Sequence, residues 1–240
     1  LETLDSFTIK KKPKDKAFRM HVQDVYKFTR GGDNRRIIAG TVVSGKLSVG
    51  DEVIFYPSGK KSKVKSLETF NKEKQMTVEA GNAIGFILEE QIYVTRGEIT
   101  TLLNEPKPNV TSRIKVNLFW LGKNPMKMKK KYTFKLGTAK TGVEIEEINM
   151  VMNSSNLEKQ KKDWIEKYDV AECILKLDKA IAFDLVNEIV ETSRFVIVDD
   201  YRIAGGGIIQ EALEDEKSWI RDKVLIRDNK WEKSWVTKIE

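Results

Sequence analysis

The sequence predicts an all-β protein: two consecutive antiparallel β-barrels followed by a polar C-terminal linker. Three observations support this class. Short runs rich in Val, Ile, Phe and Thr recur, turn residues separate them at close spacing, and a proline-containing break interrupts them near the middle. The length of 240 residues is enough for one or two domains. We therefore predict a linker at 1–16, a barrel at 17–104, a second barrel at 105–210 and a second linker at 211–240.

The first barrel is predicted from strand-like runs that Gly, Asp, Asn and Pro punctuate. These runs span residues 22–28, 36–43, 52–56 and 83–88. The last of them is apolar throughout, which is typical of a fully buried strand. Between two of the runs, Ser44-Gly45-Lys46 has the composition of a hairpin turn. The basic stretch before Phe18 is interpreted as a linker or an entering edge strand.

The second barrel is predicted to begin after residues 103–108, which carry two prolines and no periodicity. Residues 113–120 then alternate, with their apolar side chains on one face. Similar strand patterns recur further along, at 132–136, 143–148, 171–177 and 194–198. Residues 153–167 form the most helix-like stretch. After Gln210 the chain is charged and too short to form a third core.

The composition narrows the class of protein and its partners. Hydrophobic residues make up 40% and charged residues 33%, and no apolar run is long enough to cross a membrane. The net charge of +7 is compatible with nucleic acid, but the lysines are dispersed among glutamates, so we favour a Lys-rich surface. A cytoplasmic location is expected, because Cys173 is the only cysteine and no internal disulfide can form. With His21 as the only histidine, a zinc site is not expected.

The motifs of nucleotide binding are missing from this stretch of sequence. Ser44-Gly45-Lys46 lacks the upstream glycine of a phosphate-binding loop, and it lies between strand patterns. The run Gly205-Gly206-Gly207 lacks the spacing of a dinucleotide-binding turn, so tight backbone packing inside a barrel is the favoured explanation. The lysines of 123–131 either contact phosphates or lie in a solvated loop, and the loop is favoured.

Candidates for catalysis are equally weak. Cys173 lies on the apolar face of a predicted strand, which indicates a buried, inert thiol. A lone His21 is more often structural or exposed than catalytic. The adjacent carboxylates Glu146-Glu147 and Asp199-Asp200 point to opposite faces of a strand and do not converge. We therefore expect no catalytic residue, cofactor site or metal site in this chain.

Several segments together resemble translation-factor-type GTPases, of which elongation factor Tu is the best known. Residues 36–53 (RIIAGTVVSGKLSVGDEV) and 80–85 (AGNAIG) resemble the second domain of that family. Residues 203–209 (IAGGGII) are similar to the closing strand of the third domain. The resemblance implies that the two predicted barrels are of the domain II and domain III type.

A finer resemblance is to the large, GTPase subunit of sulfate adenylyltransferase. It is carried by residues 18–26 (FRMHVQDVY), 95–98 (TRGE), 116–120 (VNLFW) and 194–199 (RFVIVD). This sequence departs from the family pattern at Glu98, where Asp is usual, and at Met20-His21, where Phe-Pro is usual. The resemblance implies a module that couples GTPase state to the small catalytic subunit during sulfate assimilation.

The C-terminal segment extends the resemblance to fused forms of this enzyme. Residues 224–231 (VLIRDNKW) and 236–237 resemble the segment that leads into an adenylylsulfate kinase. The parent protein would then carry a GTPase domain before Leu1 and a kinase after Glu240. GTP, ATP and Mg are expected to bind those domains, and no cofactor is expected here.

Four residues within the matching motifs are candidate contacts with a partner or between domains: Arg96, Glu98, Arg194 and Asp199. The stretch Arg96-Gly97-Glu98 either ends a strand in a charged turn or forms a contact loop, and the sequence leaves both open. The alternative function is RNA binding by a barrel pair from a translation factor. The kinase-like C-terminal segment favours the sulfate adenylyltransferase interpretation, because a translation factor would end near Gln210.

Overall fold

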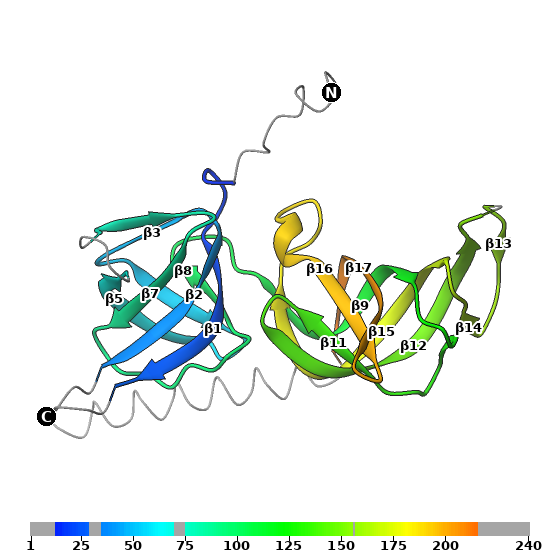
Figure 1. The fold of residues 1–240 in the computed structure, drawn as a ribbon. Coiled ribbons are helices and arrows are strands. Elements are labelled where there is room, and N and C mark those ends of the chain that lie inside the picture. Colours follow the sequence, from blue (N-terminus) through cyan, green and yellow to red (C-terminus); the bar gives the residue numbers. More distant parts are fainter. Residues whose placement is uncertain (1–12, 29–34, 70–74, 156, 216–240) are drawn as a thin grey trace, which may run out of the picture.

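Two β-barrels lie side by side, joined by a short extended connection between Leu102 and Asn109 (Figure 1). The computed structural model describes residues 13–28, 35–69, 75–155 and 157–215. Most of the two predicted linkers, and the kinase-like motif at 224–231, lie outside these residues. The architecture confirms the predicted class of two consecutive all-β barrels.

The first barrel is a closed ring of six antiparallel strands. Its hydrogen-bonded order is β1 (Arg19–Lys27), β2 (Arg36–Ser44), β7 (Ala83–Leu88), β5 (Lys60–Glu68), β4 (Glu52–Tyr56) and β8 (Ile99–Leu102). A small pair, β3 (Lys46–Ser48) and β6 (Thr77–Glu79), covers one end. Along β2 and β7 inward residues alternate with outward ones, as closure around a single core requires. The rings of Phe55 and Phe86 stack in that core, with centroids 6.4 Å apart.

The second barrel is built from longer strands. Its order is β11 (Tyr132–Leu136), β16 (Arg194–Asp199), β17 (Arg202–Leu213), β9 (Asn109–Trp120), β15 (Asp169–Phe183) and β12 (Ala139–Asn153). Pairing between β11 and β12 returns the sheet to its first strand and closes the ring. The predicted alternation in β9 is confirmed, because Ile114, Val116, Leu118 and Trp120 are all fully buried. Strand β17 continues past Gln210 to Leu213, since its last residues still pair with β9.

The predicted helix at 153–167 is wrong. The described part of this stretch contains β13 (Lys159–Gln160), which extends β12, and β14 (Trp164–Ile165), which pairs with β10 (Met126–Lys127). Ile165 and Met126 are buried in the barrel core while Trp164 is half-exposed, so the pattern here is that of a strand. Within the described ranges, no helix has the length and apolar character needed to cross a membrane.

Cys173 lies fully buried in β15, as predicted. Burial raises the pKa of its thiol to about 12, so the thiolate that would react is not populated at neutral pH. Among the described residues, no group of three or more His, Cys, Asp or Glu side chains is placed to hold a metal ion.

The three consecutive glycines of β17 are required by close packing, as predicted. A Cβ at Gly207 would lie 2.0 Å from the backbone oxygen of Asn117 on β9. A Cβ at Gly205 would lie 2.8 Å from the Trp120 ring. Neighbouring strands therefore approach β17 more closely than a side chain permits.

Replacing Gly207 by alanine is expected to destabilise the chain by about 1–3 kcal/mol, because the new methyl group must displace backbone rather than a flexible side chain. Urea unfolding followed by circular dichroism measures this loss. Gly206→Ala is the matched control on the same strand, because its Cβ would lie 3.0 Å from the backbone oxygen of Phe195 and a smaller loss is expected. Equal losses in both variants would contradict the packing explanation.

Candidate functional site

A buried ion pair joins the two barrels. Arg19 begins β1 of the first barrel, and Asp184 follows β15 of the second. The Arg19 guanidinium donates to the Asp184 carboxylate from Nε at 2.9 Å and from Nη2 at 2.8 Å. Both side chains are almost wholly excluded from solvent, at 2% and 3% exposure. A buried ion pair is stable only when the remaining donors and acceptors of both side chains are also hydrogen-bonded.

The remaining polar atoms of this pair find partners on three separate segments. Arg19 also donates to the carbonyl oxygens of Phe18 at 2.9 Å and of Pro106, in the inter-barrel connection, at 2.8 Å. The hydroxyl of Thr192 donates to Asp184 at 2.7 Å. The pair therefore ties together the first barrel, the connection and the second barrel.

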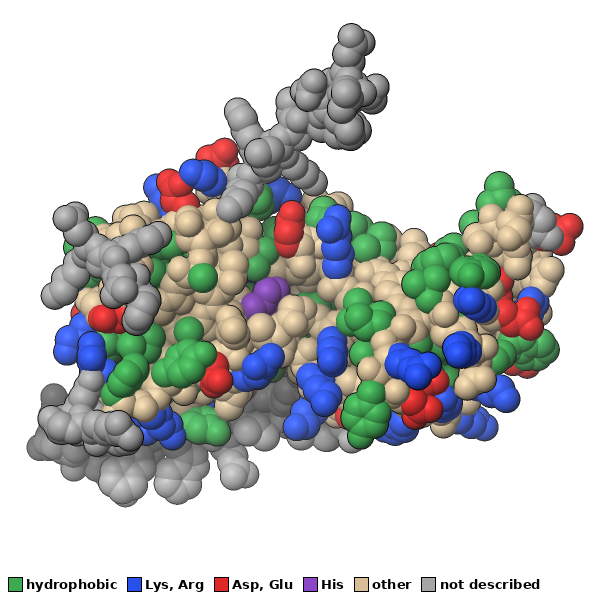
Figure 2. Space-filling model, in the orientation of Figure 1, with side chains coloured by type: hydrophobic (Ala, Val, Ile, Leu, Met, Phe, Trp, Pro, Cys, Tyr) green, Lys and Arg blue, Asp and Glu red, His purple; other side chains and the backbone are tan. Residues whose placement is uncertain are grey.

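His21 packs against the second barrel two residues further along β1. A Cβ on Gly137, in the turn between β11 and β12, would lie 2.6 Å from the imidazole ring. Gly137 also has φ +53, a conformation that favours glycine. The ring is 9% exposed, and its Nδ1 has no hydrogen-bond partner among the described residues. Figure 2 shows this histidine at the junction of the barrels.

Burial lowers the pKa of His21 to about 4, although the nearby negative charge of Asp184 opposes the shift. The imidazole is therefore neutral at physiological pH. This places His21 in the structural class that the sequence favoured.

Two further contacts extend the junction. The Thr138 hydroxyl donates to the backbone oxygen of Val22 at 2.8 Å. Gly97, with φ +96, lies against Ala139, whose Cα is 3.0 Å from the position of a Cβ. We call the contact surface the seam and define it by Arg19, His21, Val22 and Gly97 of the first barrel and Gly137, Thr138, Ala139 and Asp184 of the second.

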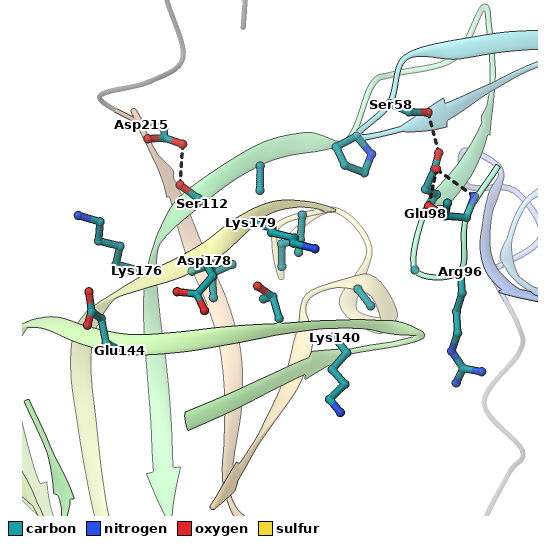
Figure 3. A pocket seen from close by; sticks show the side chains of 18 of the residues that line it. Ser58, Arg96, Glu98, Ser112, Lys140, Glu144, Lys176, Asp178, Lys179 and Asp215 are labelled. Atoms are coloured by element: carbon teal, nitrogen blue, oxygen red, sulfur yellow. Dashed lines mark hydrogen bonds between the residues drawn. The ribbon is translucent and has the colours of Figure 1, made fainter. Parts of the chain in front are cut away.

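An open groove of about 1040 Å³ adjoins the seam, with walls from both barrels (Figure 3). Tyr93 and Arg96 contribute from the first barrel, and Lys140, Asp178 and Lys179 from the second. Asp178 is neutralised by an ion pair with Lys131. Six Lys and Arg residues and four carboxylates line the groove, so the lining carries a net positive charge. In the described part of the chain, Arg96, Lys140 and Lys179 form no ion pair.

The four residues singled out from the sequence occupy different environments. Glu98 is buried in the first barrel, where its carboxylate accepts hydrogen bonds from Ser58 at 2.7 Å and from the Thr95 hydroxyl at 2.8 Å. Arg96 is exposed at the rim of the groove. The stretch 96–98 is therefore a charged turn and a contact loop at once, because Glu98 closes the turn while Gly97 touches the second barrel.

The other two candidates lie at opposite ends of β16. Arg194 is exposed at its start. Asp199, at its end, accepts a hydrogen bond from Lys130 at 2.7 Å, within an ion pair. The structure thus places Asp199 within the second barrel's own network and away from the seam.

Sequence reasoning missed the seam itself. The feature that indicates the seam is the start of β1, where residues 18–22 are all buried. A strand of a solvated barrel normally buries only every second residue. A strand buried on both faces needs a cover on its outer side. Arg19 within such a run also requires a buried counter-charge, and Asp184, directly after the apolar end of β15, supplies it.

Comparisons with known proteins agree with this architecture. Residues 35–99 match the model of elongation factor Tu domain 2, and residues 113–210 match that of GTP-eEF1A C-terminal domain-like proteins. The barrel pair has the elongation-factor domain II and III fold. A crystal structure of Sup35 complexed with GDP superposes on the pair with a TM-score of 0.75 at 18% identity, covering 89% of this chain and 52% of that one.

Several sequence relatives of the barrel pair are sulfate adenylyltransferase subunits 1. Sulfate adenylyltransferase subunit 1 from Vibrio atlanticus is 31% identical over 216 residues, covering 89% of this chain. The protein of the same name from Sulfurovum sp. is 31% identical over 206 residues, covering 83% of this chain. The chain spans only 44% and 42% of the length of these relatives.

Proposed function

We propose that the barrel pair is the non-catalytic coupling module of a GTP-dependent sulfate adenylyltransferase. In this role it transmits the nucleotide state of a GTPase domain to the adenylyltransferase partner subunit. Homology at about 30% identity to sulfate adenylyltransferase subunit 1 supports the assignment. The observation that carries the coupling role is the buried seam, because two barrels joined in this way move as one body.

In this proposal, the seam is the means by which a non-catalytic module contributes to an enzyme. A closed barrel resists deformation, since a packed core shifts between discrete arrangements rather than bending continuously. Displacement of the first barrel by a GTPase domain would be carried through Arg19 and Asp184 to the second barrel. A partner subunit that contacts the second barrel would then respond to the bound nucleotide.

The proposal extends to the parent protein in the form that the sequence predicts. GTP and Mg would bind a preceding GTPase domain, and ATP a following adenylylsulfate kinase. The partner would be the small catalytic subunit of sulfate adenylyltransferase, in the cytoplasm. The kinase-like residues 224–231 support the fusion.

Turnover and binding assays on the pure 240-residue chain test this function. We expect no GTP hydrolysis, no adenylylsulfate formation from ATP and sulfate, and no phosphorylation of adenylylsulfate. We also expect the chain to bind the small subunit encoded in the same genome, measured by calorimetry. Turnover of any of the three reactions, or failure to bind that subunit, would contradict the proposal.

The second candidate function, RNA binding, is favoured by the uncompensated cations of the groove. It predicts tight tRNA binding whose affinity falls steeply as salt is raised. Weak or salt-insensitive binding in the same calorimetric assay would exclude it.

A further inference from the structure

Two lysines face each other on the outer surface of the second barrel. Lys135 of β11 is directly opposite Lys140 of β12 in the antiparallel ladder, and both are exposed. Neither has an ion-pair partner within the described ranges. Like charges placed opposite each other on neighbouring strands destabilise a sheet. Replacing either lysine by an acidic residue would remove this repulsion. The lysine pair therefore lowers the stability of the isolated fold.

The positive charge continues on both sides of this pair. Val196 of β16 lies opposite Lys135, and Arg194, two residues away, points to the same outer face. On the other side, Gly97 touches Ala139, and the next residues along the chain, Arg96 of the first barrel and Lys140, line the same groove. We call this set the basic patch and define it by Arg96, Lys135, Lys140 and Arg194. Figure 2 shows Lys and Arg side chains gathered beside His21 at the junction.

Acidic side chains border the basic patch on the side of the groove. Asp178 lies against Gly142, since a Cβ there would be 2.0 Å from its carboxylate oxygen, and it pairs with Lys131. Glu144 lines the groove beyond it (Figure 3). Because Asp178 is paired, Glu144 is the carboxylate that limits the positive potential on this side.

We propose that the basic patch is a docking surface for an acidic face of a partner protein, and this rests on the proposed coupling function. Complementary charge attracts such a partner and fixes its orientation. A protein face with localised carboxylates matches a patch of four cations with an acidic border. A continuous phosphate backbone along the groove would instead meet the carboxylate of Glu144, which disfavours nucleic acid.

The position of the basic patch also suits coupling. Arg96 belongs to the first barrel and the other three cations to the second, so a docked partner contacts both bodies at the seam. The partner would therefore follow the movement of both barrels, which the seam holds together as one body.

Charge reversal on each barrel tests the docking surface, with the small sulfate adenylyltransferase subunit from the same genome as the probe. The test variant is Arg96→Glu with Lys135→Glu. The matched control is Lys65→Glu with Lys159→Glu, two exposed residues on β5 and β13, which changes the net charge equally and also alters one residue on each barrel. We expect the test variant to bind at least about tenfold more weakly than the control and to lose most of the salt dependence of binding.

A thermal measurement separates binding from folding. In the test variant, Lys135→Glu places a carboxylate opposite Lys140. The melting temperature of this variant should therefore equal or exceed that of the wild type. A twenty-nucleotide RNA serves as the second probe. The inference is overturned if wild type, test variant and control bind the small subunit alike, or if the test variant loses only RNA binding. Failure of the wild-type chain to bind the subunit overturns the coupling function and the docking surface together.

Discussion

Replacing Asp184 by alanine is expected to lower the free energy of unfolding by about 3–5 kcal/mol, because Arg19 would stay buried without its counter-charge. The loss includes the acceptor of the Thr192 hydroxyl. We also expect unfolding in urea to separate into two transitions, since the barrels would no longer be held together. Circular dichroism across the urea titration measures both effects.

Asp178→Ala is the matched control for this prediction. It removes an aspartate from the exposed pair with Lys131 on the same barrel. Exposed ion pairs contribute little, so we expect no measurable change in the unfolding midpoint. A similar loss in both variants, or a single unshifted transition in Asp184→Ala, would show that the ion pair does not join the barrels.

The stability of the chain is expected to fall by about 3 kcal/mol between pH 6.5 and pH 4 on account of His21 alone. The pKa of this histidine is lowered from 6.5 to about 4 in the folded chain. Between these values the unfolded chain binds more protons than the folded one, so acid favours unfolding. The stabilisation is complete above pH 6.5 and is lost progressively as the pH falls towards 4.

His21→Gln isolates this contribution, because the amide does not titrate while the carboxylates of both proteins do. Chemical unfolding at half-unit pH steps should give a flatter profile for the variant across this window. Asp184, whose negative charge acts on the imidazole, remains in the variant. Parallel profiles for the two proteins would show that His21 is not buried in its neutral form.

The barrels were predictable from sequence because a closed sheet imposes a period of two on strands whose outer face is solvated. The alternation in residues 113–120 reports the inner and outer faces of β9 directly. At 153–167 the same reasoning failed. The strands β13 and β14 are two residues long, too short to display a period.

The seam was not predictable from local pattern, because its partners are far apart in the chain. Arg19 and Asp184 are separated by 165 positions, and they meet only once both barrels have closed and packed. Of the candidate contact residues, Arg96 lies next to Gly97, which touches Ala139 in the seam. Asp199 belongs instead to the second barrel's own network. Which motif residues face a second domain depends on packing that no single strand encodes.

The central claim is that the seam holds the two barrels as one body, and a distance measurement between them tests it most directly. Spin labels at Lys61→Cys on β5 and Glu147→Cys on β12 report this distance by pulsed electron paramagnetic resonance. The native Cys173 is buried, with its pKa raised to about 12, and should remain unlabelled. The account predicts one narrow distance distribution that broadens when Asp184→Ala is added. A broad or multimodal distance distribution in the doubly labelled chain that keeps Asp184 would contradict the account.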